Sequence, residues 1–245
     1  MLVNPENVLP YSSDERKEVQ IEQMFDKIAG RYDRLNRILS LGFDRFWRRR
    51  CIDYLRPYMP EKMLDIASGT GDLAILACKR LQPKQVIAAD LSNEMMEVGR
   101  RKVAQIGFSD RIIFDHQDCM SLSYDDHTFD AVTAAFGVRN FSQIKRGLAE
   151  MYRVIKPGGH IVILELSVPA YFPMKHLYHL YSRVMVSFVG GLLGLERAAY
   201  QYLPKSIKVM PQGKEMIGLL HEQGFSGGRV KRLTMGVCSM YTAVK

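Results

Sequence analysis

Cysteine is scarce in this sequence, and the few that occur exclude two kinds of site. The 245 residues contain four cysteines, which are Cys51, Cys78, Cys119 and Cys238. They form neither a CxxC pair nor a cluster with histidine, so the spacing of a zinc site or of a disulfide framework is missing. We therefore expect no metal and a reducing, cytoplasmic environment.

Long apolar runs are also missing. The N-terminal stretch MLVNPENVLPYSSDERKEVQ is polar and acidic, unlike a secretory signal. The longest apolar stretch, residues 184–195, contains three glycines and is shorter than the roughly 20 residues of a membrane-spanning helix. The sequence thus predicts a cytoplasmic protein that meets a membrane, if at all, peripherally at its inner face.

Basic residues outnumber acidic ones, which gives a formal net charge of +8. Much of the excess lies in RFWRRR at residues 45–50. Such a cluster fits a basic soluble protein, and it also fits attraction to an anionic membrane or nucleic acid. One short cluster without an RNA-binding motif is weak evidence for RNA. We expect no nucleic-acid partner and favour peripheral contact with anionic headgroups.

From residue 63 onward, short apolar runs alternate with helical patterns. Predicted strands cover residues 63–67, 85–90, 111–117, 129–136 and 160–166, and predicted helices cover 72–81, 93–107 and 143–155. This alternation indicates a parallel, doubly wound α/β sheet. A helix at about 211–223 follows. The last apolar runs, 228–234 and 236–244, lie too close together for a crossover and predict an antiparallel hairpin.

Two further helical segments flank this pattern. Residues 14–58 have helical spacing, and we treat residues 1–58 as an N-terminal helical arm of the same domain as residues 59–245. The segment at about 171–204 begins with many aromatic, Met and Leu residues and is expected to be a helical insertion. Two interpretations stay open for it: a lid over an apolar tunnel, or an ordinary helix of the core or of a homodimer interface.

The segment MLDIASGTGDLA at residues 63–74 joins the first predicted strand to the first predicted helix. Its GTGDLA part fits the G-x-G-x-x-G/A loop of a dinucleotide site, and Asp90 follows about 20 residues later. A methyl-donor site uses the same turn and the same acid. Asp65 inside the strand suits an ammonium, whereas Asp72 at the helix start would repel a pyrophosphate. With the C-terminal hairpin, these acids favour a methyl donor.

S-adenosylmethionine carries an ammonium, a carboxylate, a sulfonium and a ribose. The residues expected to bind it are Gly69, Thr70 and Gly71 in the loop, Asp65 at the ammonium, Asp90 with Leu91 at the ribose, and Asp118 with Cys119 at the adenine amine. Simpler alternatives remain for the acids. Asp65 and Asp72 can hydrogen-bond the loop, and Asp118 can be a turn residue.

Two segments outside the loop resemble the signatures of the ubiquinone/menaquinone biosynthesis C-methyltransferases. They are MFDKIAGRYDRLNRILSLGFDRFWRR at 24–49 and RVIKPGGHIVILELS at 153–167, and FGVRN at 136–140 also resembles that family. The resemblance spans about residues 17–244. It implies the class I S-adenosylmethionine-dependent methyltransferase fold, which is Rossmann-like, with a seven-stranded, mostly parallel sheet.

The resemblance also implies a reaction, in which a methyl group passes to a ring carbon of a prenylated quinol without a metal. Its donor positions fall on Thr70, Asp90 and the pair Asp118–Cys119. A further donor position is usually Ser in the family and is Ala135 here. Where the family often has His, this chain has Asp44, so no catalytic role is carried over to that residue.

A quinol hydroxyl has a pKa of about 10, like that of Tyr, so the enzyme must favour the phenolate that makes the ring carbon nucleophilic. The candidates are Arg139, which can stabilise that charge, and Tyr32 and Asp33, which can help to take up the proton. Each has a structural alternative: a salt bridge for Arg139, a core aromatic for Tyr32 and a brace of the arm for Asp33.

The expected function is therefore C-methylation of a prenylated quinol. Demethylmenaquinol is favoured over a benzoquinol because the N-terminus lacks an organelle-targeting stretch. A class I methyltransferase for another small aromatic or lipid-like substrate is the alternative. We call the turn that contains Gly69, Thr70 and Gly71 the donor loop. A non-catalytic accessory subunit would require that this loop or Asp90 be lost, and all of these residues are intact.

Overall fold

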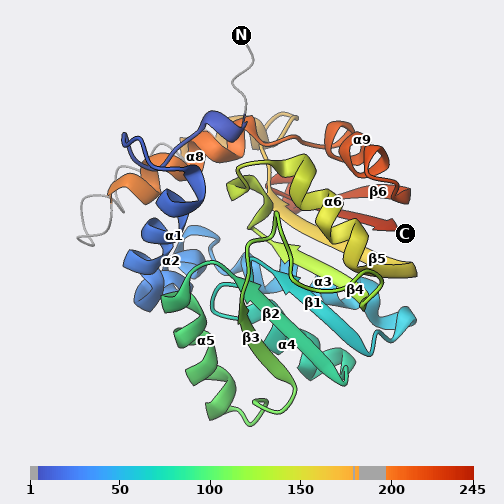
Figure 1. Cartoon of the computed structure of the whole chain (residues 1–245). Helices are drawn as coiled ribbons and strands as arrows, with labels where there is room; N and C mark the ends of the chain where they lie inside the picture. Colours follow the sequence, from blue (N-terminus) through green and yellow to red (C-terminus); the bar gives the residue numbers. More distant parts are fainter. Residues whose placement is uncertain (1–4, 179, 182–196) are drawn as a thin grey trace.

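One sheet of seven strands lies at the centre of the molecule, with helices on both of its faces (Figure 1). The structure is a computed structural model that describes residues 5–178, 180–181 and 197–245. The strand order is β3-β2-β1-β4-β5-β7-β6. The strands are β1 (Lys62–Ile66), β2 (Gln85–Asp90), β3 (Ile112–His116), β4 (Phe129–Ala135), β5 (Ile155–Leu166), β6 (Ser226–Leu233) and β7 (Cys238–Val244).

The strand directions agree with the sequence pattern. Strands β1 to β5 are parallel to their neighbours, whereas β7 runs antiparallel to both β5 and β6. The predicted parallel sheet and C-terminal hairpin are thus confirmed. In a parallel arrangement the carboxyl ends of β1, β2 and β4 meet at one edge, which is where ligands bind in open α/β sheets.

Helices α4 (Asp72–Leu81), α5 (Asn93–Gln105), α6 (Ile144–Val154) and α9 (Lys214–Glu222) correspond to predicted helices. The N-terminal part forms α1 (Lys17–Ile28), α2 (Tyr32–Leu39) and α3 (Phe43–Leu55). Short 3-10 turns are η1 (Pro5–Asn7), η2 (Ala29–Arg31), η3 (Arg56–Tyr58), η4 (Val138–Asn140) and η5 (Thr234–Gly236). In Figure 1, α1, α2 and α8 (Arg197–Val209) lie together on one side of the sheet.

Two details differ from the sequence pattern. Strand β5 begins at Ile155, five residues earlier than expected, because the KPGG segment continues the strand with a bulge opposite Phe129 and Ala131. The first part of helix α8, residues 197–204, lies within the helical insertion expected at 171–204, but the helix continues past Pro204, which is normally a helix-ending signal, to Val209. Of the expected insertion at 171–204, residues 174–178 and 180–181 are helical, and residues 179 and 182–196 lie outside the described part.

The core is divided between the two faces of the sheet. In β5, Ile161 and Ile163 pack against α6 and α9, whereas Val162 and Leu164 pack against α3 and α4. This alternation follows from the two-residue period of a strand. Because α3 contributes Trp47 and other buried side chains to the second cluster, the N-terminal arm is part of the same core.

Core position should decide the cost of removing apolar atoms. Ile163 on the central strand β5 is fully buried, whereas Ile113 on the edge strand β3 is 44% exposed. We expect Ile163→Ala to lower the free energy of unfolding by about 2–5 kcal/mol, because a cavity remains. Ile113→Ala, the matched control, should cost about 1 kcal/mol or less. Equal losses in urea unfolding would contradict this packing.

Candidate functional site

The loop after β1 adopts a backbone conformation with positive φ, which is unfavourable for residues other than glycine. Ala67, Gly69 and Gly71 all have positive φ, at 51°, 56° and 74°. A Cβ atom on Gly71 would lie 2.7 Å from the ring of Phe114, so glycine is required there by space as well as by conformation. The turn thus brings the backbone of residues 67–71 against the end of β2.

Asp90 at the end of β2 anchors this loop. Its Oδ2 accepts the amide N–H of Gly69 at 2.7 Å, and its Oδ1 accepts that of Ser92 at 2.9 Å. Burial raises the pKa of Asp90, and the amide donors oppose that rise. Each carboxylate oxygen retains capacity for a further donor, and Asp90 lines the adjacent cleft. A pair of vicinal hydroxyls matches that remaining capacity.

Asp65 is a buried carboxylate with one oxygen left over. Thr133 Oγ1 donates to its Oδ1 at 2.7 Å, but Oδ2 has no hydrogen-bond partner among the described residues. Burial raises the pKa of Asp65 to about 7. It lines a small cavity together with Ser68, Thr70 and Ala135. A bound cation would satisfy Oδ2 and hold the carboxyl ionised, so the arrangement fits an ammonium group.

A cleft of about 700 Å³ runs from this loop along the carboxyl ends of β1, β2 and β4. Its lining includes Leu91, Cys119, Met120 and Phe136. Of the predicted pair Asp118–Cys119, the cysteine lines the cleft. The Oδ1 atom of Asp118 instead accepts the amide of Met120 at 2.9 Å and so shapes the turn.

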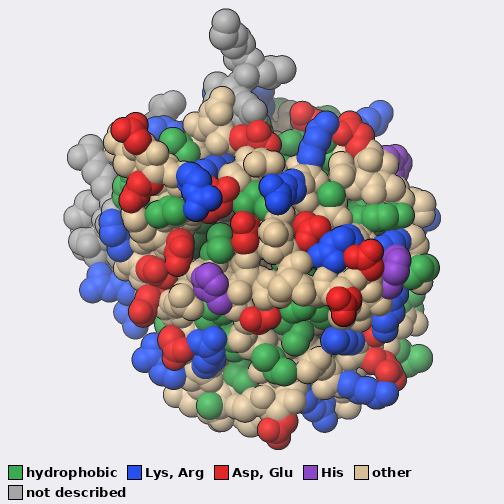
Figure 2. All heavy atoms as spheres, in the orientation of Figure 1, with side chains coloured by type: hydrophobic (Ala, Val, Ile, Leu, Met, Phe, Trp, Pro, Cys, Tyr) green, Lys and Arg blue, Asp and Glu red, His purple; other side chains and the backbone are tan. Residues whose placement is uncertain are grey.

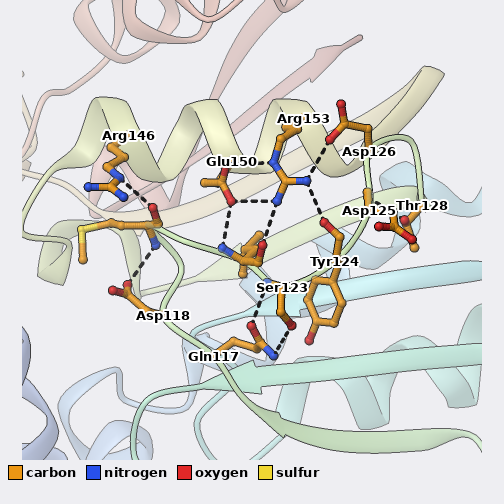
Figure 3. A network of polar contacts seen from close by, with 12 residues as sticks. Gln117, Asp118, Ser123, Tyr124, Asp125, Asp126, Thr128, Arg146, Glu150 and Arg153 are labelled. Atoms are coloured by element: carbon orange, nitrogen blue, oxygen red, sulfur yellow. Dashed lines mark hydrogen bonds and ion pairs between the residues drawn. The ribbon is translucent and has the colours of Figure 1, made fainter.

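The loop that carries Cys119 is held from outside by helix α6 (Figure 3). Arg153 donates through Nη1 to the carbonyl of Tyr124 at 2.7 Å and through Nη2 to that of Leu122 at 2.8 Å. Glu150 accepts the amide N–H of Leu122 at 2.8 Å and pairs with Arg153. The backbone of the loop therefore depends on a carboxylate–guanidinium pair that lies outside the cleft.

Arg146 completes this attachment nearer the cleft. Its Nε donates to the carbonyl of Met120 at 2.8 Å. The helix positions 146, 150 and 153 lie on one face of α6, and the loop residues that they bind are 120, 122 and 124. Residues three or four apart on the helix therefore bind residues two apart in the loop. We call Arg146, Glu150 and Arg153 the α6 clamp. This clamp fixes the position of Cys119 and Met120.

A second network joins the arm to the donor loop. Thr70 Oγ1 donates to Asp33 Oδ1 at 2.6 Å, and Lys102 on α5 donates to Asp33 Oδ2 at 2.8 Å. Lys102 also binds Thr70 and Asp72. For Asp72, burial alone would raise the pKa, but Arg48 and Lys102 lower it below its ordinary value. Asp33 therefore lies in an ion pair at the donor loop, and sequence reasoning missed Lys102.

Arg139 is buried in an ion pair with Glu165, the last but one residue of β5. Its backbone N–H reaches Glu165 Oε1 at 3.1 Å, and its Nη1 reaches Oε2 at 3.1 Å and also binds the carbonyl of Phe136. Burial alone would lower the pKa of Arg139, but Glu165 raises it above its ordinary value. Its Nε has no partner among the described residues. The guanidinium thus stays charged and keeps a donor.

An apolar chamber of about 890 Å³ adjoins the cleft. Phe136 lines both spaces, and Arg139 lies in the chamber wall. Tyr32 lines the cleft and shares a smaller cavity with Arg139 and Asn140, whose Oδ1 has no partner in the part of the chain that is described. The structure thus brings together Tyr32 and Arg139 at the junction of the two spaces. It places Asp33 apart, at Thr70.

Asp44, where the family often has His, also lines the chamber. It is buried, accepts a hydrogen bond from Ser40 Oγ at 2.9 Å and pairs with Arg48 Nη1 at 2.6 Å.

Burial raises the pKa of Tyr32, and the charge of Arg139 opposes that rise. Across residues 5–178, 180–181 and 197–245, no group of three His, Cys, Asp or Glu is placed to hold a metal ion.

The strand order of the sheet and the glycine loop, with Asp65 and Asp90 beside it, together define a class I methyltransferase fold. A solved S-adenosylmethionine-dependent methyltransferase of Thermotoga maritima, titled a possible histamine N-methyltransferase, superposes with a TM-score of 0.64. It covers 91% of this chain and 99% of its own, at 17% identity, which shows the fold alone.

Sequence comparison gives the family. The model of the ubiE/COQ5 methyltransferase family matches residues 13–245, so the chain belongs to this family. It is 52% identical to the demethylmenaquinone methyltransferase of Bacteroides fragilis over 98% of both chains. It is 41% identical to the ubiquinone/menaquinone biosynthesis C-methyltransferase UbiE of Geotalea daltonii, over 94% of this chain and 97% of that one.

The state of Asp65 should make donor binding depend on pH. In the unfolded chain this carboxyl ionises near pH 4, whereas in the fold its pKa is about 7. Without ligand, its contribution to stability therefore falls as the pH rises through that window. We expect the affinity for S-adenosylmethionine to rise between about pH 5.5 and about pH 7, as Asp65 ionises to meet the ammonium.

Titration calorimetry across that range checks this expectation. Asp65→Asn should bind the donor more weakly and lose most of the pH dependence. The control is Asp130→Asn, which changes an aspartate at the opposite end of β4 that binds Lys62 and Lys156. An unchanged pH profile in Asp65→Asn would show that another group meets the ammonium.

The α6 clamp should act on donor affinity and not on the chemical step. Arg153→Met removes two of the three contacts that α6 makes with carbonyls of the loop, so we expect KM for S-adenosylmethionine to rise several-fold while kcat changes little. The matched control is Arg80→Met, which breaks a surface ion pair with Asp53 away from the cleft. A fall in kcat with unchanged donor affinity would contradict this assignment, as would equal effects of the two variants.

Proposed function

We propose that this chain transfers the methyl group of S-adenosylmethionine to a ring carbon of a prenylated quinol, with demethylmenaquinol as substrate and menaquinol as product. The observation that carries the proposal is the junction at Phe136, where a cleft that contains Asp90 and the glycine loop meets an apolar chamber with a buried cation in its wall. The names of the relatives in Bacteroides fragilis and Geotalea daltonii support the quinone substrate.

The donor would be held by groups that retain hydrogen-bonding capacity within the described part of the chain. The free Oδ2 of Asp65 suits the ammonium, and the remaining acceptor capacity of Asp90 suits the ribose hydroxyls. Leu91, Cys119 and Met120 offer an apolar wall for the adenine. When bound, S-adenosylmethionine supplies an activated methyl group on a sulfonium, so the protein's own task is to position the acceptor and adjust its protonation.

Arg139 is the group that adjusts the acceptor. A quinol hydroxyl is mostly protonated at neutral pH, since its pKa is about 10. A guanidinium in a dry pocket favours the phenolate by charge-assisted hydrogen bonding, and the phenolate makes the adjacent ring carbon more nucleophilic. Glu165 fixes the guanidinium of Arg139 in place. The Nε of Arg139, which has no partner among the described residues, is available for the substrate oxygen.

Tyr32 and Asn140 share the small cavity beside Arg139 and can hold a water that takes up the proton. For Asp33 we propose a supporting role. Its carboxylate is bound by Thr70 and Lys102, so it orients the donor loop and is poorly placed to accept the proton of the ring. This contact pattern distinguishes it from the other two catalytic candidates.

The substrate's tail places a further requirement on the protein. A prenylated quinol resides in a bilayer, so we propose a cytoplasmic enzyme that contacts the membrane peripherally. No helix among the described residues is both long enough and apolar enough to cross a bilayer. Homodimer formation through the 171–204 insertion stays a prediction, and light scattering of the purified chain would test it.

The substrate is identified by expression in a bacterial strain that lacks its own quinone methyltransferase. Mass spectrometry of the extracted lipids should show menaquinone restored from demethylmenaquinone. Return of methylated benzoquinone alone would redirect the proposal to ubiquinone synthesis. If the purified protein binds S-adenosylmethionine but methylates no quinol, the substrate assignment is wrong.

Replacing Arg139 should slow methyl transfer without weakening donor binding. Arg139→Lys keeps a positive charge for Glu165 but removes the planar donor group, so we expect kcat to fall about 10²- to 10³-fold. The Kd for S-adenosylmethionine and the unfolding midpoint should stay close to those of the unaltered protein. A normal kcat in this variant would exclude Arg139 from stabilising the phenolate.

A further inference from the structure

Exposed apolar side chains gather around the chamber. The described residues include 14 large hydrophobic side chains that are exposed to solvent, and nine of them lie in three segments that also line the chamber. These nine, which we call the apolar rim, are Ile38, Leu41, Phe43, Phe46, Tyr171, Phe172, Leu177, Leu180 and Met235. Scattered exposed hydrophobics are ordinary, but a concentration around one cavity marks an interaction surface.

Two rim residues lie at the tips of tight turns in a disfavoured backbone conformation. Leu41 has φ 50° and is 68% exposed, and Met235 has φ 53° and is 69% exposed. Glycine and asparagine adopt this left-handed region far more readily than leucine or methionine. Neither side chain is buried in the fold, so the fold itself gives no reason for an apolar residue at either tip.

The three rim segments are tied into one surface. Trp47 Nε1 donates to Thr234 Oγ1 at 2.7 Å, which joins α3 to the turn that carries Met235. The hydroxyl of Tyr181 donates to the carbonyl of Leu39 at 2.6 Å, which joins residues 171–181 to the end of α2. The guanidinium of Arg232 also lies 5.7 Å from the ring centre of Tyr171. These contacts link the three rim segments to one another.

The exposed charge that α2 and α3 themselves carry is positive. Exposed arginines on these helices are Arg34, Arg37, Arg45, Arg49 and Arg50. The acidic residues of the two helices are already bound in ion pairs: Asp33 by Lys102, Asp44 by Arg48 and Asp53 by Arg80. The face that carries α6 differs, because acidic and basic side chains are interspersed there (Figure 2).

We propose that the apolar rim is a membrane-docking surface that rests on an anionic lipid bilayer. Arginines among protruding apolar side chains match the boundary between anionic headgroups and acyl chains. Docked in this way, the chamber opens toward the bilayer, and a prenyl tail can pass between lipid and protein without crossing water. This inference rests on the proposed quinol substrate for its purpose, but vesicle binding itself does not.

The first test measures sedimentation of the purified full-length chain with lipid vesicles. We expect binding to vesicles that contain phosphatidylglycerol, weaker binding to pure phosphatidylcholine, and loss of the difference at high salt. Leu41→Asn and Met235→Asn should each reduce binding, and both should fold, because asparagine suits their backbone conformation. The matched control is Met59→Asn, since Met59 is also exposed at φ 42° but lies before β1, at the opposite edge of the sheet.

The second test separates docking from catalysis. With a short-chain quinol in solution, Leu41→Asn and Met235→Asn should keep the kcat/KM of the unaltered protein. With a long-chain quinol in anionic vesicles, their rates should fall. No vesicle binding by the unaltered protein, or equal binding by the rim variants and Met59→Asn, would overturn the proposal. So would a dimer that Leu41→Asn dissociates, because the rim would then face a second copy. Vesicle binding without methylation of any quinol would refute the substrate alone.

Discussion

A carboxylate with an unsatisfied oxygen, buried at the end of β1, is the constraint on which the rest of this site depends. Burial raises the pKa of Asp65 to about 7, and its Oδ2 has no hydrogen-bond partner among the described residues, which is unfavourable for a buried polar atom. The surrounding turn adds strain, because Ala67 also adopts a positive φ. Such features persist when a ligand relieves them. We propose that the cleft, the loop anchored by Asp90 and the α6 clamp all arrange the protein around such a ligand.

The second half of the site is built on a different principle. The chamber is mostly aromatic and aliphatic, and its ionic groups are buried in pairs, Arg139 with Glu165 and Asp44 with Arg48. A buried pair is held in one geometry by its own hydrogen bonds, and breaking it leaves an uncompensated charge. Arg139 can therefore offer a fixed donor to a forming phenolate without moving. Phe136 lines both this chamber and the cleft, so we propose that donor and acceptor meet beside it.

Local sequence patterns predicted most of the fold and the glycine turn after β1. The strands, the glycine turn and Asp90 at the end of β2 could be predicted from short segments, because burial and turn conformation depend on a few neighbouring residues. Partners distant in sequence were not predictable. Glu165 is a lone acid in an apolar run, and only the sheet brings it to Arg139. Lys102 and the α6 clamp were missed for the same reason. The continuation of α8 past Pro204 was not predictable because a proline normally ends a helix, and the positive φ of Leu41 belongs to the turn between α2 and α3.

We propose that the cleft holds a sulfonium nucleoside with its methyl group directed at the chamber. A crystal structure of the chain with S-adenosylhomocysteine would show the ligand in place. We expect the amino group within hydrogen-bond distance of Asp65 Oδ2, the ribose hydroxyls on Asp90, and the sulfur facing Phe136 and Arg139. An empty loop with the ligand bound elsewhere, or a sulfur directed away from the chamber, would contradict it.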